Sequence, residues 1–414
     1  MANPSSGQDP GKAPGQANSL WTVDFVLNML VGHFMFAGYT SLITIVPSYV
    51  LHQGGQEWQL GIIIGSFGLV AMFIRPFAGR WVYKFGAKQI AIIGTVIIAI
   101  GSLLYIVSPG PWWLVPIRMG QGIGIAMAPV ATSTIVANLA PAHRRAEAMS
   151  YMGASINVAF LYAPVVASLI LGFAGFKYAF MFSCSSALMA ALLASRLSSA
   201  RVSPPVEAST DAPTETVPLI SRAALFPAIV FMAYTFTTAP INTFLPILAE
   251  ERGLGNPGLY FTVWSVTSIA GMMFSGPVAD RFGRATVIVP GLILTACAMF
   301  LLNIANMPAM LWGAGFLAGV GFGLIQPGIQ SLVIDRVLLR ERSSGVATLQ
   351  QAWDVAGSGG AFIIGPLGGL IGVANSFGVT GVGALVGVVG FVVGNKRGPA
   401  LTPSRQTDIV ESDD

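Results

Sequence analysis

The sequence alternates between long apolar runs and short polar connections. A bilayer core about 30 Å thick requires about 20 apolar residues in each spanning helix. Runs of at least that length recur twelve times, which predicts twelve membrane-spanning helices at approximately 21–50, 58–80, 87–107, 112–138, 146–172, 176–196, 222–249, 257–279, 285–305, 309–334, 343–373 and 375–395.

Three polar segments lie outside these apolar runs, one between the two halves and one at each end of the chain. Residues 197–220 are polar and rich in proline, which predicts a cytoplasmic linker between two six-helix bundles at 21–196 and 221–395. Residues 1–20 are rich in Gly, Pro, Ser and Gln and contain no short apolar core with a cleavage site. We therefore expect them to form a disordered cytoplasmic tail and not a cleaved signal peptide. Residues 396–414 are expected to form a second cytoplasmic tail.

The two halves repeat each other at an offset of 197 residues. A parallel repeat of this kind places a substrate site at the interface of the halves, which rock against each other. The sequence therefore predicts an all-α membrane protein with twelve transmembrane helices in two six-helix repeats around a central cavity. The matching residues are Gly79, Lys84, Phe85, Gly86, Gly122, Gly124 and Arg145 in the first half, and Gly276, Arg281, Phe282, Gly283, Gly319, Gly321 and Arg342 in the second.

Composition and charge agree with this prediction. Hydrophobic residues make up 54% of the chain and charged residues only 9%, against about 25% charged in a typical soluble domain. Arg75 and Arg118 lie inside apolar runs, Lys177 and Arg252 lie on one side of the membrane, and every other Lys and Arg lies on the opposite side. Basic residues favour the cytoplasmic side, which predicts a multi-pass protein of the cell membrane with both termini cytoplasmic. There is no long basic run, so nucleic acid is not an expected partner.

The connections after the second and eighth runs carry a shared motif, GRWVYKFGAK at 79–88 and GPVADRFGRA at 276–285. It resembles the G-x-x-x-D-R-x-G-R loop signature of the major facilitator superfamily. The first copy departs from that signature, because Tyr83 replaces the Asp and Ala87 replaces the final Arg. The resemblance therefore implies that a charged latch is formed by Asp280, Arg281 and Arg284, with turns at the repeated loop residues Gly79, Lys84, Gly86, Gly276 and Gly283.

Further motifs point to the drug-efflux, proton-antiporter branch of that family. The segment 118–149, in which Arg118 precedes a Q-G-x-G sequence and a basic loop follows, resembles the fourth helix of the family. Ala163-Pro164 and Gly365-Pro366 resemble parts of its antiporter element. The resemblance implies a monomeric secondary transporter that works by alternating access, coupled to protons and without a cofactor or metal.

Ionisable residues at bilayer depth are costly and usually functional. Arg118 is interpreted as a proton-coupling or anion-binding charge, or alternatively as an Arg that fixes helix packing. Asp354 lies near mid-depth, and its repeat partner is Asn157. A buried carboxylate near an Arg experiences two opposing effects on its protonation, so it can load and release a proton. The alternative is a fixed ion pair, with Arg75 as its partner.

Other polar residues could contribute to coupling or to the cavity. An imidazole changes its charge between pH 5 and 8, so His33, with Asn28 one turn earlier, is a proton-relay candidate or a neutral hydrogen-bonded residue. The hydroxyls of Thr235, Thr237 and Thr238 could bond a substrate or their own helix. The amides of Gln121, Asn242 and Gln350 complete the candidate set, and Phe34, Phe36, Tyr39 and Trp264 could form the apolar walls.

The sequence contains no phosphate-binding loop of the G-x-x-x-x-G-K-[ST] type and no H-E-x-x-H pair, so neither ATP hydrolysis nor metal-dependent hydrolysis is expected. The leading hypothesis is proton-coupled export of a small apolar or amphiphilic compound. A proton-coupled organic anion carrier, with Arg75 and Arg118 binding a carboxylate, is the alternative within transport. A multispanning membrane enzyme is a third class, but the sequence offers no cluster of nucleophile, base or metal ligands.

Overall fold

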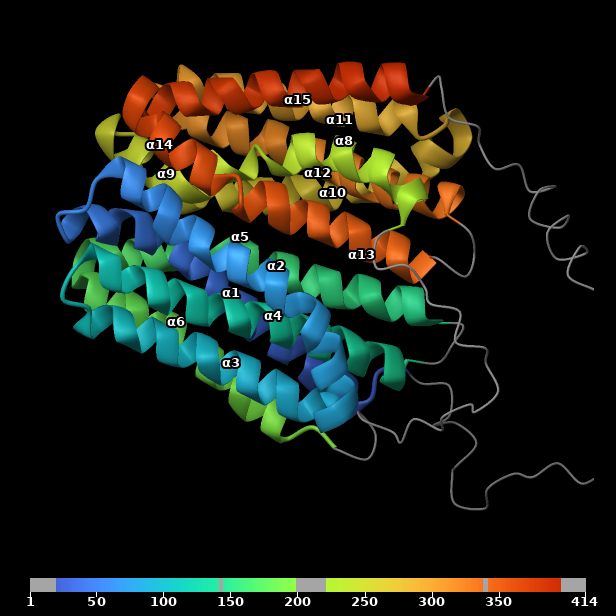
Figure 1. Cartoon of the computed structure of the whole chain (residues 1–414), viewed down its shortest axis with the longest axis horizontal. Helices are drawn as coiled ribbons and strands as arrows, with labels where there is room; N and C mark the ends of the chain where they lie inside the picture. The colour runs from blue at the N-terminus through green and yellow to red at the C-terminus, as the bar shows by residue number, and fades with distance from the viewer. Residues whose placement is uncertain (1–19, 141–143, 199–220, 338–341, 396–414) are drawn as a thin grey trace, which may run out of the picture.

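The computed structural model of the chain describes residues 20–140, 144–198, 221–337 and 342–395. Most of residues 1–20 and 197–220 and all of 396–414, predicted as tails and linker, lie outside the described residues. Within the described part the chain forms helices joined by short connections, and it contains no strand. In Figure 1 the helices run roughly parallel or antiparallel along one axis, with the earlier helices in the lower layer and the later ones in the upper layer.

The first half contains six long helices that cross the molecule in alternating directions. Short one-turn helices at Tyr105–Val107 and Pro111–Trp113 join the third helix to the fourth. The bounds are α1 Val23–His52, α2 Glu57–Phe85, α3 Ala87–Leu104, α4 Leu114–Leu139, α5 Arg145–Ala174 and α6 Phe176–Ser195.

The second half also crosses six times, but two of its crossings are broken. The seventh is divided between α8 and α9, and the eleventh contains a π-helical turn, Asp354–Ser358 (η6), between α13 and α14. The bounds are α8 Leu225–Thr235, α9 Thr238–Glu251, α10 Gly258–Phe282, α11 Ala285–Asn303, α12 Pro308–Arg336, α13 Arg342–Trp353, α14 Ala361–Ile371 and α15 Val373–Asn395.

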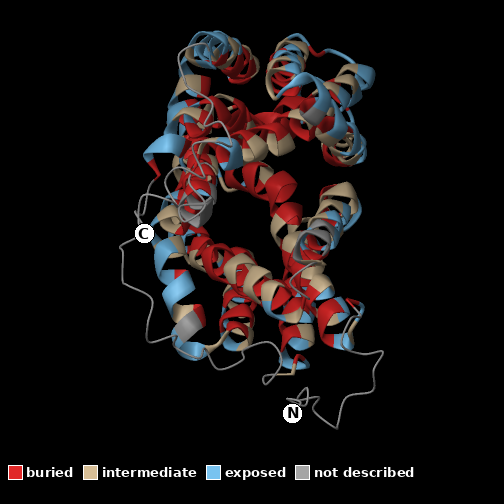
Figure 2. Ribbon diagram, turned by 90° about the vertical axis from the view of Figure 1, so that its right-hand side faces the viewer, coloured by how far each residue is buried: buried red, intermediate tan, exposed pale blue. Residues whose placement is uncertain are grey.

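Eleven segments of the described chain are long and apolar enough to cross a membrane. The twelfth crossing is α10, which has the length but carries the polar residues Ser265, Ser268 and Ser275. Buried residues face inward and exposed residues form the rim of the bundle (Figure 2). That rim is apolar: Val382, Val386 and Val389 follow one another at helical spacing on α15, and each is more than half exposed. A hydrophobic outer surface of this kind belongs in lipid, and the chain is a multi-pass membrane protein.

Glycine contacts recur at the repeat offset. A Cβ added at Gly122 of α4 would overlap the carbonyl oxygen of Phe67 on α2, and one added at Gly319 of α12 would overlap that of Trp264 on α10. The two contacts are equivalent in the repeat, because Gly319 lies 197 residues after Gly122 and Trp264 lies 197 residues after Phe67. Only glycine permits so close a helix crossing, so the repeated glycines give the two halves the same internal packing.

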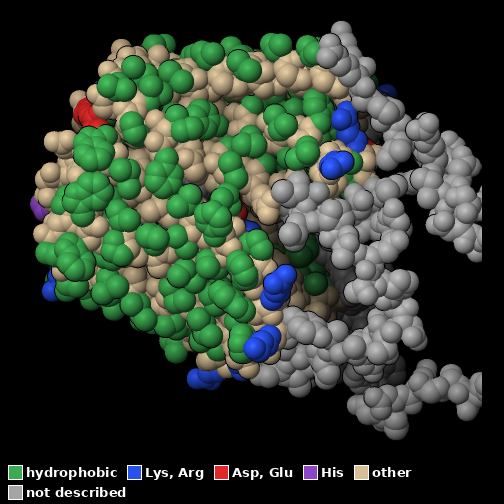
Figure 3. Space-filling view, viewed as in Figure 1, with side chains coloured by type: hydrophobic (Ala, Val, Ile, Leu, Met, Phe, Trp, Pro, Cys, Tyr) green, Lys and Arg blue, Asp and Glu red, His purple; other side chains and the backbone are tan. Residues whose placement is uncertain are grey.

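The two ends of the bundle differ in how the halves meet. Residues 20, 198, 221 and 395 all lie at one end, called here the terminal end, and the opposite end is called the far end (Figure 1). The halves touch closely towards the far end, where Gly61 of α2 packs against Gly365 of α14. The Thr262 hydroxyl of α10 donates to the Leu161 carbonyl of α5 (2.6 Å). At the terminal end the space-filling view shows a recess between the halves (Figure 3).

Candidate functional site

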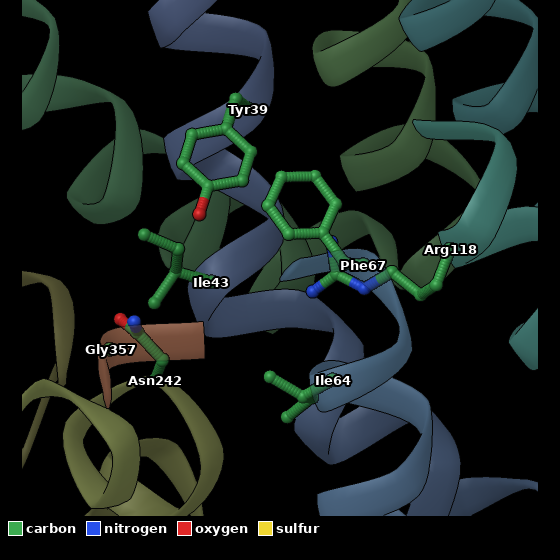
Figure 4. A pocket seen from close by; sticks show the side chains of 7 residues that line it. All are labelled: Tyr39, Ile43, Ile64, Phe67, Arg118, Asn242 and Gly357. Carbon is green, nitrogen blue, oxygen red and sulfur yellow. The ribbon is translucent and has the colours of Figure 1, made fainter. Parts of the chain in front are cut away.

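A small cavity lies at the interface of the two halves. It is lined by Tyr39 and Ile43 of α1, Ile64 and Phe67 of α2, Arg118 of α4, Asn242 of α9 and Gly357 of the π turn. The cavity has room for about one water-sized group. Figure 4 shows the Arg118 guanidinium and the Tyr39 hydroxyl directed into the space between the helices, with the Asn242 amide on the opposite side of that space. Three of the sequence candidates, Tyr39, Arg118 and Asn242, therefore meet at this site.

Arg118 is the only charged residue among the cavity's lining residues. Just 4% of its surface is exposed, and its Nε and Nη1 atoms are buried without a hydrogen-bond partner. Its guanidinium lies over the ring of Phe67, 5.5 Å from the ring centroid. The Phe67 ring also stacks on the ring of Tyr39, with 5.1 Å between the two centroids. A cation–π contact stabilises the charge only in part, so Arg118 retains unused donor capacity.

Asp354 and Arg75 form an ion pair that joins the two halves. Arg75 Nε lies 2.8 Å from Asp354 Oδ2, and Arg75 Nη2 donates a hydrogen bond of 3.0 Å to Oδ1. The Asp354 side chain is 7% exposed and that of Arg75 is 27% exposed. Because α2 and η6 belong to different halves, any motion that separates them must break this two-point contact.

The π turn connects the ion pair to the cavity. It begins with Asp354 and includes Gly357, which lines the cavity. The backbone widens at this point, and Gly359 and Gly360 follow before α14 begins at Ala361. π turns are uncommon and often occur at functional sites. A change in the contacts of Asp354 can thus reach the cavity wall within one turn of helix.

His33 links α1 to α5 and lies away from the cavity. Its Nδ1 atom is 2.9 Å from the Ser155 carbonyl oxygen, and its Nε2 atom is 3.0 Å from the Tyr162 hydroxyl. A carbonyl oxygen can only accept, so Nδ1 carries the proton, and a neutral ring then accepts from the tyrosine at Nε2. This arrangement gives both ring nitrogens a partner, and the choice between a proton relay and a neutral hydrogen-bonded residue stays a prediction.

Asn28 and Gln121 bridge helices within the first half. Asn28 donates to the Thr132 carbonyl of α4 (3.0 Å). Gln121 accepts from the Tyr105 hydroxyl (2.9 Å) and is nearly fully buried. Neither residue lines the cavity. Their amides therefore contribute to packing between α1, α3 and α4 in this conformation.

The remaining cavity candidates are dispersed. Asn157 is half-buried on α5, and Gln350 is exposed on α13. Neither lines the described cavity. The hydroxyls of Thr237 and Thr238 donate across the break to the carbonyls of Tyr234 and Thr235, the last two residues of α8. These hydroxyls therefore bond backbone carbonyls of the same crossing, and a role in substrate binding stays a prediction.

The predicted loop residues lie at the terminal end. Gly86 and Gly283 have φ angles of 88° and 92° at equivalent helix ends, a conformation that favours glycine. A Cβ at Gly79 or Gly276 would meet nothing within 4 Å. The Lys84 and Arg281 side chains lie over the adjacent rings of Phe85 and Phe282.

Arg284, one of the predicted latch residues, forms an ion pair within its own half. Arg284 Nε lies 3.0 Å from Asp335 Oδ2 of α12, which ties the loop after α10 to the same half. The equivalent positions in the first half are the uncharged Ala87 and Asn138. The Asp280 side chain lies outside the described residues, and the role assigned to it stays a prediction.

Several cavity residues carry no signal that sequence inspection detects. Ile43, Ile64 and Gly357 are ordinary apolar or small residues within apolar runs. Phe67 could have been identified, because its repeat partner is Trp264, one of the predicted wall aromatics. Trp264 itself lies 5.7 Å from the Phe160 ring and forms an aromatic contact between the halves.

Comparison with known proteins gives a consistent result. The family model described as the Major Facilitator Superfamily matches residues 29–260 and 228–410. Multidrug resistance protein 2 of Bacillus subtilis (strain 168) is 30% identical over 159 residues, which is 38% of this chain and 39% of that relative's length. The quinolone resistance protein NorA of Staphylococcus aureus (strain Mu50) is 24% identical over 304 residues, covering 71% of this chain and 77% of NorA.

Solved structures share the architecture at low identity. A mutant of the nucleoside transporter NupG superposes with a TM-score of 0.72 and 15% identity, covering 89% of this chain and 99% of that one. A bacterial homologue of the human lysosomal transporter Spinster, in an inward-facing and occupied conformation, superposes with a TM-score of 0.72 and 14% identity, covering 90% of this chain and 96% of that one. At such identities the similarity concerns the fold alone.

Proposed function

We propose that this chain, which belongs to the major facilitator superfamily and is a membrane transporter and not an enzyme, exports a small amphiphilic compound by proton antiport. The observation that carries the proposal is the Arg75–Asp354 ion pair, which joins the two halves one helical turn from the central cavity. A buried carboxylate at bilayer depth that is paired across a moving interface is suited to couple protonation to motion.

Coupling follows because the proton and Arg75 compete for the carboxylate of Asp354. Ionised Asp354 binds Arg75 through two contacts and holds α2 against the π turn. A proton on Asp354 removes the charge that Arg75 requires and weakens this contact. Loss of the contact favours rearrangement of the halves, and return of Arg75 favours release of the proton. Substrate and proton therefore bind to different states of the same interface.

Export as the direction of transport is supported by the relatives. Both named relatives are resistance proteins, one against multiple drugs and one against quinolones. The cavity walls of Tyr39, Ile43, Ile64 and Phe67 are apolar or aromatic, which suits compounds that partition into a bilayer. If the termini are cytoplasmic, the recess at the terminal end makes this an inward-facing conformation, the state that loads a substrate for export.

Reconstituted protein provides the test of the function. Proteoliposomes with an imposed pH gradient should accumulate an amphiphilic compound and release protons in the opposite direction, and the compound should be recovered unchanged. Collapse of the gradient with a protonophore should stop accumulation. Uptake that persists after the collapse, or a chemically altered compound, would contradict proton antiport.

The orientation in the membrane is a separate prediction. Arg80, Lys88, Arg196 and Arg222 lie near the terminal end, whereas Lys177 and Arg252 lie near the far end. This asymmetry predicts that both termini and the segment around residue 205 are cytoplasmic. A cysteine placed at residue 205 in cells should react with a membrane-impermeant maleimide only after permeabilisation, and a cysteine at residue 177 should react without it. The reverse pattern would contradict the predicted orientation.

A further inference from the structure

The central cavity contains a positive charge that no described residue balances. The salt bridges among the described residues join Arg75 to Asp354 and Arg284 to Asp335. Arg118 takes part in neither. Its Nε and Nη1 atoms are buried and unpaired, and burial without a counter-charge or hydrogen bonds is strongly unfavourable. A group that supplies both is therefore the natural ligand of this position.

The other polar groups of the cavity are neutral. Asn242 lines it with an amide, and Tyr39 directs a hydroxyl into it (Figure 4). Asp354, in the π turn that also contains Gly357, is already engaged by Arg75.

We infer that this cavity is an anion subsite, and that the transported compound is an amphiphilic organic anion whose carboxylate, or an equivalent oxyanion, binds Arg118. This inference rests on the proposed function and names its substrate class. A carboxylate offers two oxygens to the guanidinium fork. The apolar body of the compound then lies along Tyr39 and Phe67, which are one turn nearer the terminal end than Ile43 and Ile64, and extends towards the recess at that end.

The same geometry assigns the two arginines different roles. An anion carrier in which Arg75 and Arg118 share one carboxylate is not supported here, because both contacts of Arg75 are made to Asp354. Arg75 belongs to the coupling pair and Arg118 to the substrate. Organic cations should be excluded by like-charge repulsion from Arg118 in a site of low dielectric constant.

A matched series of probes tests the inference by binding, independently of transport. The series is 2-naphthoate, 2-naphthamide and 2-naphthylmethylammonium, which keep the ring system and change only the charge. Their dissociation constants are measured by calorimetry on the full chain in detergent. Naphthoate is expected to bind at least about tenfold more tightly than naphthamide, the gain typical of a charge-assisted hydrogen bond, and the ammonium compound should bind most weakly.

Variants assign the effect to one side chain. Arg118→Gln should remove the preference for naphthoate over naphthamide, and Arg118→Lys should retain part of it because the charge remains without the planar fork. Lys177→Gln removes one positive charge at an exposed position near the far end and should leave the preference unchanged. Thermal unfolding of each variant checks that it is folded. If Arg118→Gln does not fold, the reduced preference in Arg118→Lys still tests the inference.

Equal affinities for naphthoate and naphthamide in the wild-type protein, or tighter binding of the ammonium compound, would overturn the anion subsite. So would a preference that survives Arg118→Gln. Proton-driven export of a neutral compound with no preference for anions would contradict only this inference, whereas selective binding of naphthoate without proton-driven transport would contradict only the proposed function.

Discussion

Replacement of Asp354 by Asn is expected to abolish proton-driven accumulation while leaving exchange of substrate across the membrane intact. Asn is permanently neutral, so the variant can neither release a proton nor hold Arg75 by charge. Arg75 is 27% exposed and can find water when its partner is lost, so this variant should fold. We expect accumulation to fall to the level of passive equilibrium while counterflow of preloaded substrate continues.

The reciprocal variant should behave differently. Arg75→Gln leaves the carboxylate of Asp354, only 7% exposed, without its cationic partner. Removing one member of a buried pair costs about 3–5 kcal/mol when the remaining charge is uncompensated. Arg75→Gln should therefore lower the melting temperature more than Asp354→Asn does. The double variant Arg75→Gln/Asp354→Asn should regain most of that stability, since no unpaired charge remains.

Proton flux and substrate flux are measured in the same vesicles, and thermal unfolding in detergent gives the stability. Glu250→Gln is the matched control, because it neutralises an exposed carboxylate near the far end and should change neither flux. If Asp354→Asn still concentrates substrate against its gradient, the acid is structural and coupling must reside elsewhere. Additive destabilisation in the double variant would show that the two side chains do not stabilise each other.

The architecture was accessible from the sequence because hydropathy and helix length determine it directly. A span needs about 20 apolar residues whatever surrounds it, and the glycines at 122 and 319 repeat because the same close crossing recurs in both halves. The ion-pair alternative for Asp354 and Arg75 was also accessible. Both are charges inside apolar runs, and burial leaves each of them in need of a partner.

The sequence could not predict which polar side chains meet at the central cavity. A membrane helix is apolar on most sides, so its sequence reveals little about which face points to a cavity and which to a neighbouring helix. Gln121 and Asn242 look alike in the sequence, yet Gln121 bonds to Tyr105 and Asn242 lines the cavity. The π turn at Asp354 likewise depends on how α13 and α14 pack, and no local residue preference specifies it.

Substitution of Gly61 or Gly258 by Ala is expected to shift the protein towards a state in which the halves separate at the far end. The two glycines occupy equivalent positions in the repeat. A Cβ at Gly61 would overlap the Ala361 carbonyl oxygen and the Cα of Gly365, and a Cβ at Gly258 would overlap the backbone of Val165. Backbone atoms cannot move aside as a flexible side chain can, so closure at this end requires glycine.

The expected size of this conformational shift follows from the free-energy cost of overpacking. An extra methyl group in a tight contact costs about 1–3 kcal/mol, and every 1.4 kcal/mol changes an equilibrium about tenfold. The clash exists only when the far end is closed, so the whole cost appears as a shift between conformations. The Gly61→Ala/Gly258→Ala double variant should shift further than either single variant, because the two contacts lie on different helix pairs.

The measurement is the distance between spin labels at the far end, one in each half, with cysteines placed at positions 177 and 250 and the native Cys184 and Cys297 replaced by Ala. The glycine variants should populate longer distances than the parent. Gly120→Ala and Gly172→Ala are the matched controls, since a Cβ at either would meet nothing within 4 Å. They gain the same helix propensity and should keep the parent distribution. Unchanged distances in Gly61→Ala and Gly258→Ala would mean that the far end closes without these contacts.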